Sequence, residues 1–88
     1  MQLTIIKADN AVYIDGKMFE IDCSNLNPIF HAVQWDGTSG WKEFVQSANG
    51  PPLLNETIVS IDEFQPVIDV WNAVKQKEEQ RKLSSSPL

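Results

Sequence analysis

The sequence predicts an α+β fold in which one long C-terminal helix packs on a small antiparallel β-sheet. The sheet is expected to contain two hairpins and about four or five strands. Short segments that alternate apolar and polar residues fill the first part of the chain, and two turn sequences, Asp15-Gly16 and Asp36-Gly37, divide them. Near residue 61 the apolar spacing changes to three and four, which is typical of a helix.

Length and composition indicate one small soluble domain. The chain has 88 residues, of which 42% are hydrophobic and 22% are charged. We expect a single domain over residues 1–83, with strands at about 2–59 and the helix at about 61–83, followed by a disordered tail at 84–88. No apolar run approaches the roughly 20 residues that cross a bilayer, and the first residues lack the pattern of a secretion signal. Membrane attachment is therefore not expected.

The first hairpin is predicted from period-two alternation and turn residues. In the first strand, Leu3 and Ile5 share one face while Thr4 and Ile6 share the other. Asp15-Gly16 is a strong signal for a tight reversal between the two strands that follow. The three strands are expected at Gln2–Lys7, Ala11–Ile14 and Met18–Cys23.

The second hairpin has a tryptophan at each shoulder of its turn. Gly37 and Gly40 can adopt the positive φ angles of a tight reversal, and the Asp36 side chain can bond back to the turn backbone. A loop by composition follows at 47–52, and a short extended segment comes after it. The strands of this half are expected at Ile29–Asp36, Trp41–Gln46 and about Glu56–Val59.

The C-terminal helix is predicted from its start signal and its apolar stripe. Ser60 and Glu63 have capping-box spacing, in which each side chain bonds to the other's backbone amide. Because Pro66 lacks an amide donor, we expect a single turn over Ile61–Phe64 and then the main helix, with Pro66 in its first turn. Trp71 is expected at the centre of the contact with the sheet. Beyond Val74 the helix is polar and should extend into solvent.

No group of residues is arranged for covalent chemistry. His31 is the only histidine, and it lies in phase with Val33 and Trp35, so we expect a half-buried sheet residue. Cys23 is the only cysteine, which excludes an internal disulfide, fits a reducing cytosol and indicates a small buried hydrophobic residue. The acidic residues are scattered beside turns. We therefore expect no enzyme activity, no catalytic or metal site and no cofactor.

The charge is unevenly distributed along the chain. The formal net charge is −5, and residues 1–74 carry −7 while residues 75–88 carry +2. An acidic body repels phosphate backbones. Nucleic-acid binding is therefore not expected.

Exposed aromatic residues are the best candidates for a binding surface. Two tryptophans that flank one turn are difficult to bury together, and an exposed one can anchor a partner protein. The candidate protein-binding residues are those in and beside the second hairpin: His31, Trp35, Asp36, Trp41 and Phe44.

Several sequence blocks together resemble a family of tailed-phage and prophage proteins. In chain order the blocks are Asp15-Gly16, Ile21-Asp-Cys-Ser-Asn-Leu, His31-Ala-Val-Gln-Trp-Asp-Gly-Thr, Phe44-Val45 and Phe64-Gln-Pro-Val-Ile-Asp-Val-Trp. The third and the last of these are the most specific. Members of the family are commonly called tail-fibre assembly proteins or tail assembly chaperones. The resemblance spans about residues 2–74, and the chain lacks the longer helical extension of many members.

The resemblance implies a protein that binds a phage tail fibre, a tailspike or another tail protein during virion assembly. It would act in the host cytoplasm, by binding alone, and it could also be incorporated in the virion. Two alternatives remain open: a structural component of the tail, such as a baseplate or fibre-junction subunit, and a small inhibitor of a host defence complex. The sequence does not fix the oligomeric state.

Overall fold

The computed structural model describes residues 1–26, 28–46 and 48–84, and it confirms the α+β fold. Within these ranges six strands form one antiparallel sheet, where about four or five were expected. The strands are β1 (Leu3–Ile6), β2 (Ala11–Ile14), β3 (Lys17–Glu20), β4 (Phe30–Trp35), β5 (Gly40–Phe44) and β6 (Glu56–Ile58). The helices are the short η1 (Lys7–Asp9) and η2 (Asp62–Phe64) and the long α1 (Gln65–Ser84).

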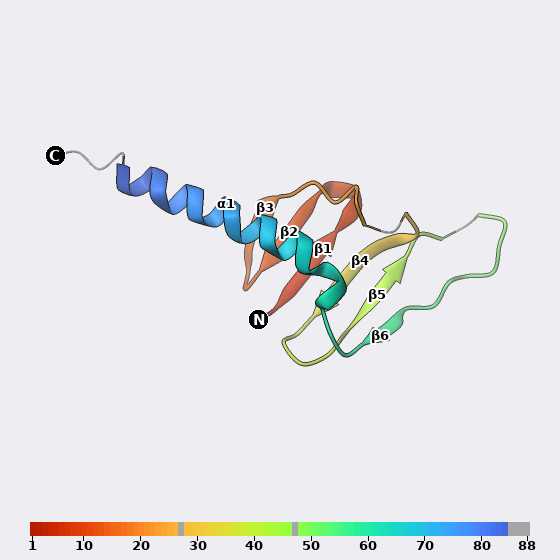
Figure 1. The fold of residues 1–88 in the computed structure, drawn as a ribbon. Coiled ribbons are helices and arrows are strands. Elements are labelled where there is room, and N and C mark those ends of the chain that lie inside the picture. The colour runs from red at the N-terminus through yellow and green to blue at the C-terminus, as the bar shows by residue number, and fades with distance from the viewer. Residues whose placement is uncertain (27, 47, 85–88) are drawn as a thin grey trace.

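The sheet consists of two three-stranded meanders joined through β1 and β4. The strand order is β3-β2-β1-β4-β5-β6, and α1 crosses one face of this sheet (Figure 1). Leu3 pairs with Ile14 on one side and with Trp35 on the other. Because facing residues in an antiparallel pair point to the same side, this register defines which side chains share a face.

The first turn adopts the conformation that its sequence predicts. Asp15 has φ 49° and Gly16 has φ 86°, as a type I′ reversal requires. The third strand, expected at Met18–Cys23, ends earlier, because the backbone beyond Glu20 bonds to Asn10. The Ile21 amide donates to the Asn10 carbonyl at 2.8 Å and the Cys23 amide to Asn10 Oδ1 at 3.0 Å. Cys23 is buried, as predicted.

A β-bulge at His31 corrects the predicted phase of β4. Phe30 pairs with Phe44 and Ala32 pairs with Glu43, so one extra residue lies between the two pairs. His31 is exposed, and the expectation of a half-buried histidine was wrong. The bulge places the Phe30 ring in the core, 5.3 Å from that of Phe64.

The second turn uses its two glycines for different reasons. Gly37 has a φ of 113°, whereas Gly40 does not have a positive φ. A Cβ atom on Gly40 would lie 1.9 Å from the Gln34 carbonyl oxygen, so the close backbone approach of β4 and β5 requires glycine there. Asp36 Oδ1 accepts hydrogen bonds from the amides of Thr38 and Ser39, each at 2.9 Å, as predicted.

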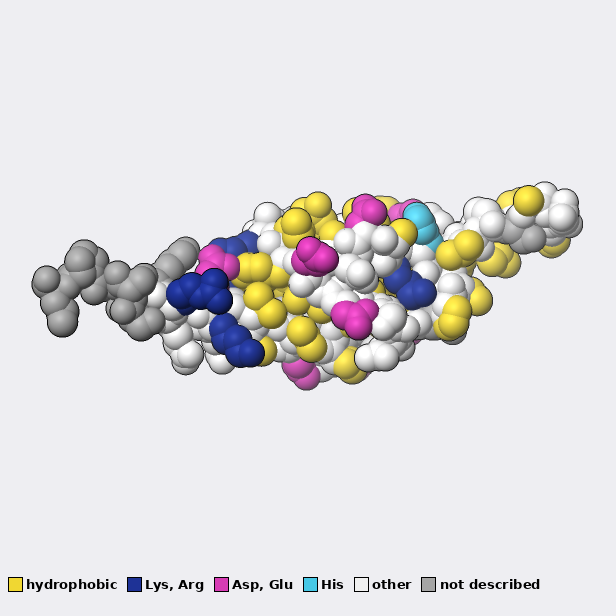
Figure 2. All heavy atoms as spheres, turned by 90° about the horizontal axis from the view of Figure 1, so that it is seen from above, with side chains coloured by type: hydrophobic (Ala, Val, Ile, Leu, Met, Phe, Trp, Pro, Cys, Tyr) yellow, Lys and Arg dark blue, Asp and Glu magenta, His cyan; other side chains and the backbone are white. Residues whose placement is uncertain are grey.

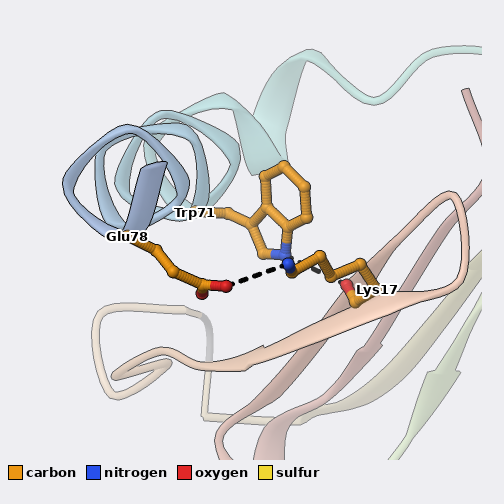
Figure 3. Close-up of polar contacts among 3 residues, drawn as sticks. All are labelled: Lys17, Trp71 and Glu78. Carbon is orange, nitrogen blue, oxygen red and sulfur yellow. Dashed lines mark hydrogen bonds and ion pairs between the residues drawn. The ribbon is translucent and has the colours of Figure 1, made fainter. Parts of the chain in front are cut away.

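The helix is fixed to the sheet by buried apolar residues and by contacts with β3. Trp71 is buried, its ring lies 5.2 Å from that of Phe19, and its indole nitrogen donates to the Lys17 carbonyl at 3.2 Å. Lys17 Nζ also forms an ion pair with Glu78 at 3.1 Å (Figure 3). The helical residues of the core cluster are Phe64, Val67, Ile68 and Trp71, and the strand residues include Leu3, Ile5, Val12 and Val33.

Neither half of the predicted capping box between Ser60 and Glu63 forms at the helix start. The Ser60 hydroxyl accepts from the Asp62 amide at 3.1 Å, while the Glu63 carboxylate pairs with Lys42 at 2.9 Å and does not reach back to Ser60. The turn at η2, followed by α1 with Pro66 in its first turn, agrees with the prediction. Ser84 ends α1, and the remainder of the predicted tail, 85–88, lies outside the described residues. None of the described helices has an apolar stretch sufficient to span a membrane.

Candidate functional site

The two faces of the sheet differ in what covers them. The row that faces α1 is buried at its centre, at Val12, Ile5 and Val33. The neighbouring row points away from α1 and continues across all six strands. We call this second surface the open face, and its row runs Met18, Tyr13, Thr4, Gln34, Trp41 and Thr57.

Two shallow hollows lie side by side on the open face. The larger has a volume of about 540 Å³ and includes Trp41, Gln34 and Thr57 in its lining. The smaller has a volume of about 340 Å³ and includes Tyr13 and Ile6. Thr4, at the centre of the row, lines both. The open face is therefore a broad, mixed surface and not a deep small-molecule cavity.

The side chains of the open face are held in place by hydrogen bonds. The Trp41 indole nitrogen donates to Glu43 Oε2 at 2.9 Å, and both residues lie on β5. Thr4 Oγ1 donates to Gln34 Oε1 at 2.9 Å, across the junction of the two meanders. Trp41 is nevertheless 43% exposed. A fixed, exposed aromatic ring loses little conformational freedom when a partner covers it.

The surroundings of the open face are acidic. Glu20 and Glu43 belong to the next row on the same side of the sheet, and the turns at its ends contain Asp15 and Asp36. Among the described residues, neither row contains a lysine or arginine, and neither hollow is lined by one. A partner with a basic rim would complement this charge.

The residues singled out from the sequence do not lie on one surface. Trp35, Asp36 and Trp41 line the larger hollow, but only Trp41 belongs to the row of the open face. Trp35 pairs with Gly40 and points toward the core side, and Asp36 lies in the turn after β4, at the border of the open face. Phe44 faces the core side opposite Phe30. His31 is exposed at the bulge and lines a separate hollow with Lys7 and Asp22 in its wall.

Two charged groups near the second hairpin have shifted pKa values, and both stabilise local structure. The backbone amides of Ser39 and Thr38 lower the pKa of the Asp36 carboxyl group, since they bond to its charged form. The hydrogen bond with Glu63 raises the pKa of Lys42, whose side chain is 18% exposed. Lys42 points to the core side and joins β5 to η2. Lys42 does not belong to the open face, and Asp36 lies in the turn at its border, where it lines the larger hollow.

Sequence reasoning missed most of the open face. Thr4 and Ile6 were placed together by alternation, but Tyr13, Met18, Gln34 and Thr57 were not recognised as neighbours. The missing information was the pairing of β1 with β4, which joins the two meanders. Alternation assigns residues to a face of one strand, whereas the strand order decides which residues become neighbours.

No group of three histidine, cysteine, aspartate or glutamate side chains in the described part of the chain could hold a metal ion. Comparison of the chain with protein-family models, curated proteins and solved structures finds no match. The resemblance to tail-fibre assembly proteins therefore stays a prediction from the sequence.

Proposed function

We propose that this protein assists the assembly of a phage tail fibre or other tail protein, in the host cytoplasm and by binding alone. The proposal combines the sequence resemblance with the open face of the sheet. The observation that carries it is the exposed Trp41, which shares one row of side chains with Tyr13 and Met18 on the sheet surface that α1 leaves uncovered. Exposed apolar surface of this kind is typical of protein-binding sites.

The chemistry of the open face supports a partner that is itself rich in β-structure. Aromatic and β-branched residues pack well against the pleated surface of another sheet. Polar groups at the centre, Thr4 and Gln34, already bond to each other, so covering them costs less than covering unpaired groups. A folding fibre subunit exposes such strands transiently, and a protein that covers them would prevent aggregation.

The acidic surroundings favour reversible and selective binding. The body of the chain, residues 1–74, has a net charge of −7, which keeps it in solution and repels other acidic surfaces. A partner surface with a basic rim would be attracted to the acidic border of the open face. Binding to such a surface should weaken as the salt concentration rises.

Co-expression with the fibre subunit encoded beside this chain tests the proposal. We expect more soluble, trimeric fibre in the presence of the wild-type chain than in its absence. The Trp41→Ser variant should lose most of this effect, whereas His31→Ser, an exposed position off the open face, should retain it. Equal yields of trimer with and without the chain would contradict the proposal.

The composition of purified virions separates assistance from incorporation. A protein that only assists assembly should be absent from mature particles when they are analysed by mass spectrometry. Its presence in a fixed ratio to the fibre would instead assign it to the structure of the tail.

A further inference from the structure

The connection between β5 and β6 presents apolar side chains at one end of the molecule. No charged residue occurs from position 45 to position 55, although the chain as a whole is 22% charged. Leu54 is 82% exposed and Leu53 is 43% exposed. The connection projects beyond the sheet at the end opposite the C-terminus (Figure 1), and hydrophobic side chains are visible along it in Figure 2.

The Gln46 side chain holds this connection in place near Leu53. The Leu53 amide donates to Gln46 Oε1 at 2.8 Å, and Gln46 Nε2 donates to the Leu53 carbonyl at 2.9 Å. Gln46 Nε2 also donates to the Phe44 carbonyl at 3.1 Å. One amide side chain thus satisfies both backbone groups of Leu53, as a neighbouring strand would.

We call these hydrogen bonds between the Gln46 side chain and Leu53 the Gln46 clamp. The clamp takes the place of the pairing between β5 and β6, which stops before Gln46. Lys42 pairs with Glu56, and this is the last pair of the ladder between β5 and β6. Three residues after Lys42, the Val45 amide bonds to the Ile29 carbonyl at 2.8 Å, on the side away from β6. The Gln46 amide therefore fixes the backbone of Leu53 where the ladder is absent. Leu53 on a fixed backbone, with Leu54 next to it in the chain, forms a partly pre-organised apolar projection.

We propose that Leu53 and Leu54 insert into an uncharged apolar pocket on the partner protein, as a second contact beside the open face. This inference rests on the proposed function. A protein pocket fits better than a membrane, since an acidic body is repelled by anionic lipid surfaces. It also fits better than a second copy of this chain, because two copies with a net charge of −5 repel each other.

Affinity measurements with the fibre subunit encoded beside this chain test the inference. The double variant Leu53→Ser/Leu54→Ser keeps the backbone groups that Gln46 holds. It should raise the Kd on the order of 30-fold, the effect of losing a central apolar anchor. Val59→Ser is the matched control: Val59 is 86% exposed but lies beyond β6. It should leave the Kd unchanged.

The Gln46→Ala variant tests the role of the clamp. It retains both leucines but releases the backbone of Leu53, so the Kd should rise about threefold to tenfold because the projection must be ordered on binding. Circular dichroism of each variant should match the wild-type spectrum, since the affected side chains are exposed.

The outcomes distinguish this inference from the function on which it rests. If the wild-type chain does not bind the fibre subunit, the proposed function fails and this inference fails with it. If the wild-type chain binds and the double-serine variant binds equally well, only the role of the leucines is overturned. Leucine-dependent binding to phosphatidylcholine vesicles, or a leucine-dependent dimer in light scattering, would assign the projection to a membrane or to a second copy instead.

Discussion

The two faces of the sheet are built from the same six strands, offset by one residue, yet they have different roles. On the covered face, Ile5 lies between Val12 and Val33, and all three are buried. One residue earlier, Thr4 lies between Tyr13 and Gln34, and these side chains remain partly accessible. Stability therefore depends mainly on one face, while the other is free to vary with a partner.

The polar groups of the two faces also differ in their arrangement. On the covered face they lie at the two edges of the sheet: Lys42 contacts Glu56 and Glu63 and links η2 to β5, while Lys17 on β3 contacts Glu78 of α1. On the open face they lie at the centre, where Thr4 bonds to Gln34. The covered face thus has an apolar centre under α1, whereas the open face has a polar centre between aromatic side chains.

The largest effect is expected from removing the buried α1 side chain that packs on the covered face at β3. Trp71→Ala should lower the free energy of unfolding by about 3–5 kcal/mol, because it removes a buried ring and its contact with Phe19. Chemical denaturation measures this loss. Trp71→Phe keeps an aromatic ring but removes the hydrogen bond to the Lys17 carbonyl, and it should cost about 1 kcal/mol. A loss below 1 kcal/mol for Trp71→Ala would contradict the assignment of stability to this face.

The next effect concerns the backbone that both faces share. Gly40→Ala should lower the free energy of unfolding by about 1–3 kcal/mol, because the new Cβ would meet the Gln34 carbonyl. Gly16→Ala is an informative comparison. Nothing lies within 4 Å of the Cβ position at Gly16, so only the positive φ of 86° would strain an alanine there. Thermal unfolding of both variants compares the cost of a steric clash, at Gly40, with the cost of an unfavourable φ angle, at Gly16.

A smaller effect is expected from the ion pair between Lys42 and Glu63, which links β5 to η2. Lys42→Met should cost about 0.5–1 kcal/mol at neutral pH, where the pair with Glu63 is charged. The pKa of Lys42 is raised above its ordinary value of 10.5 by Glu63. The stabilisation by Lys42 is therefore present below the ordinary pKa, and it is lost as the pH rises through the raised pKa of the folded protein. The difference in stability between wild type and variant should disappear in strongly alkaline solution, and a constant difference would contradict this account.

Local signals predicted those parts of the fold that local chemistry decides. The reversal at Asp15-Gly16, the bonding of Asp36 within its turn and the position of Pro66 in the first turn of α1 all follow from a few adjacent residues. The burial of Trp71 followed from helical spacing. Each of these features depends on residues that are neighbours in the sequence or lie one helical turn apart.

Long-range pairing decided what the sequence alone did not predict. The bulge at His31 changes which side chains of β4 reach the core, and a strict alternation has no place for an extra residue. Glu63 was expected to cap the helix but pairs instead with Lys42, which is distant in the sequence. The clamp formed by Gln46 likewise requires a residue across the loop. Strand pairing also decided which candidate binding residues share a face, and only Trp41 lies in the row of the open face.

The contribution of Asp36 to stability, in the turn that joins β4 and β5, should be lost in acid, whereas that of Lys42 is lost in alkaline solution. Asp36→Ala removes an acceptor for the amides of Thr38 and Ser39, so it should lower the melting temperature at neutral pH, by less than Lys42→Met. These bonds lower the pKa of Asp36 below its ordinary value of 3.8. The stabilisation by Asp36 is therefore present above the ordinary pKa, and it is lost as the pH falls through the lowered pKa of the folded protein. Melting curves of wild type and variant should converge in acid, and a gap that widens there would contradict this.

The smallest effect on stability is expected at the residue most important for the proposed binding. Trp41→Thr should change the free energy of unfolding by no more than about 0.5 kcal/mol, because the ring is exposed and threonine suits a strand. The same variant should lose most binding to the fibre subunit. If Trp41→Thr instead destabilised the protein as much as Trp71→Ala, the open face would be part of the core. The difference between the two tryptophans is therefore the most direct measurement of how far the two faces of this sheet are specialised.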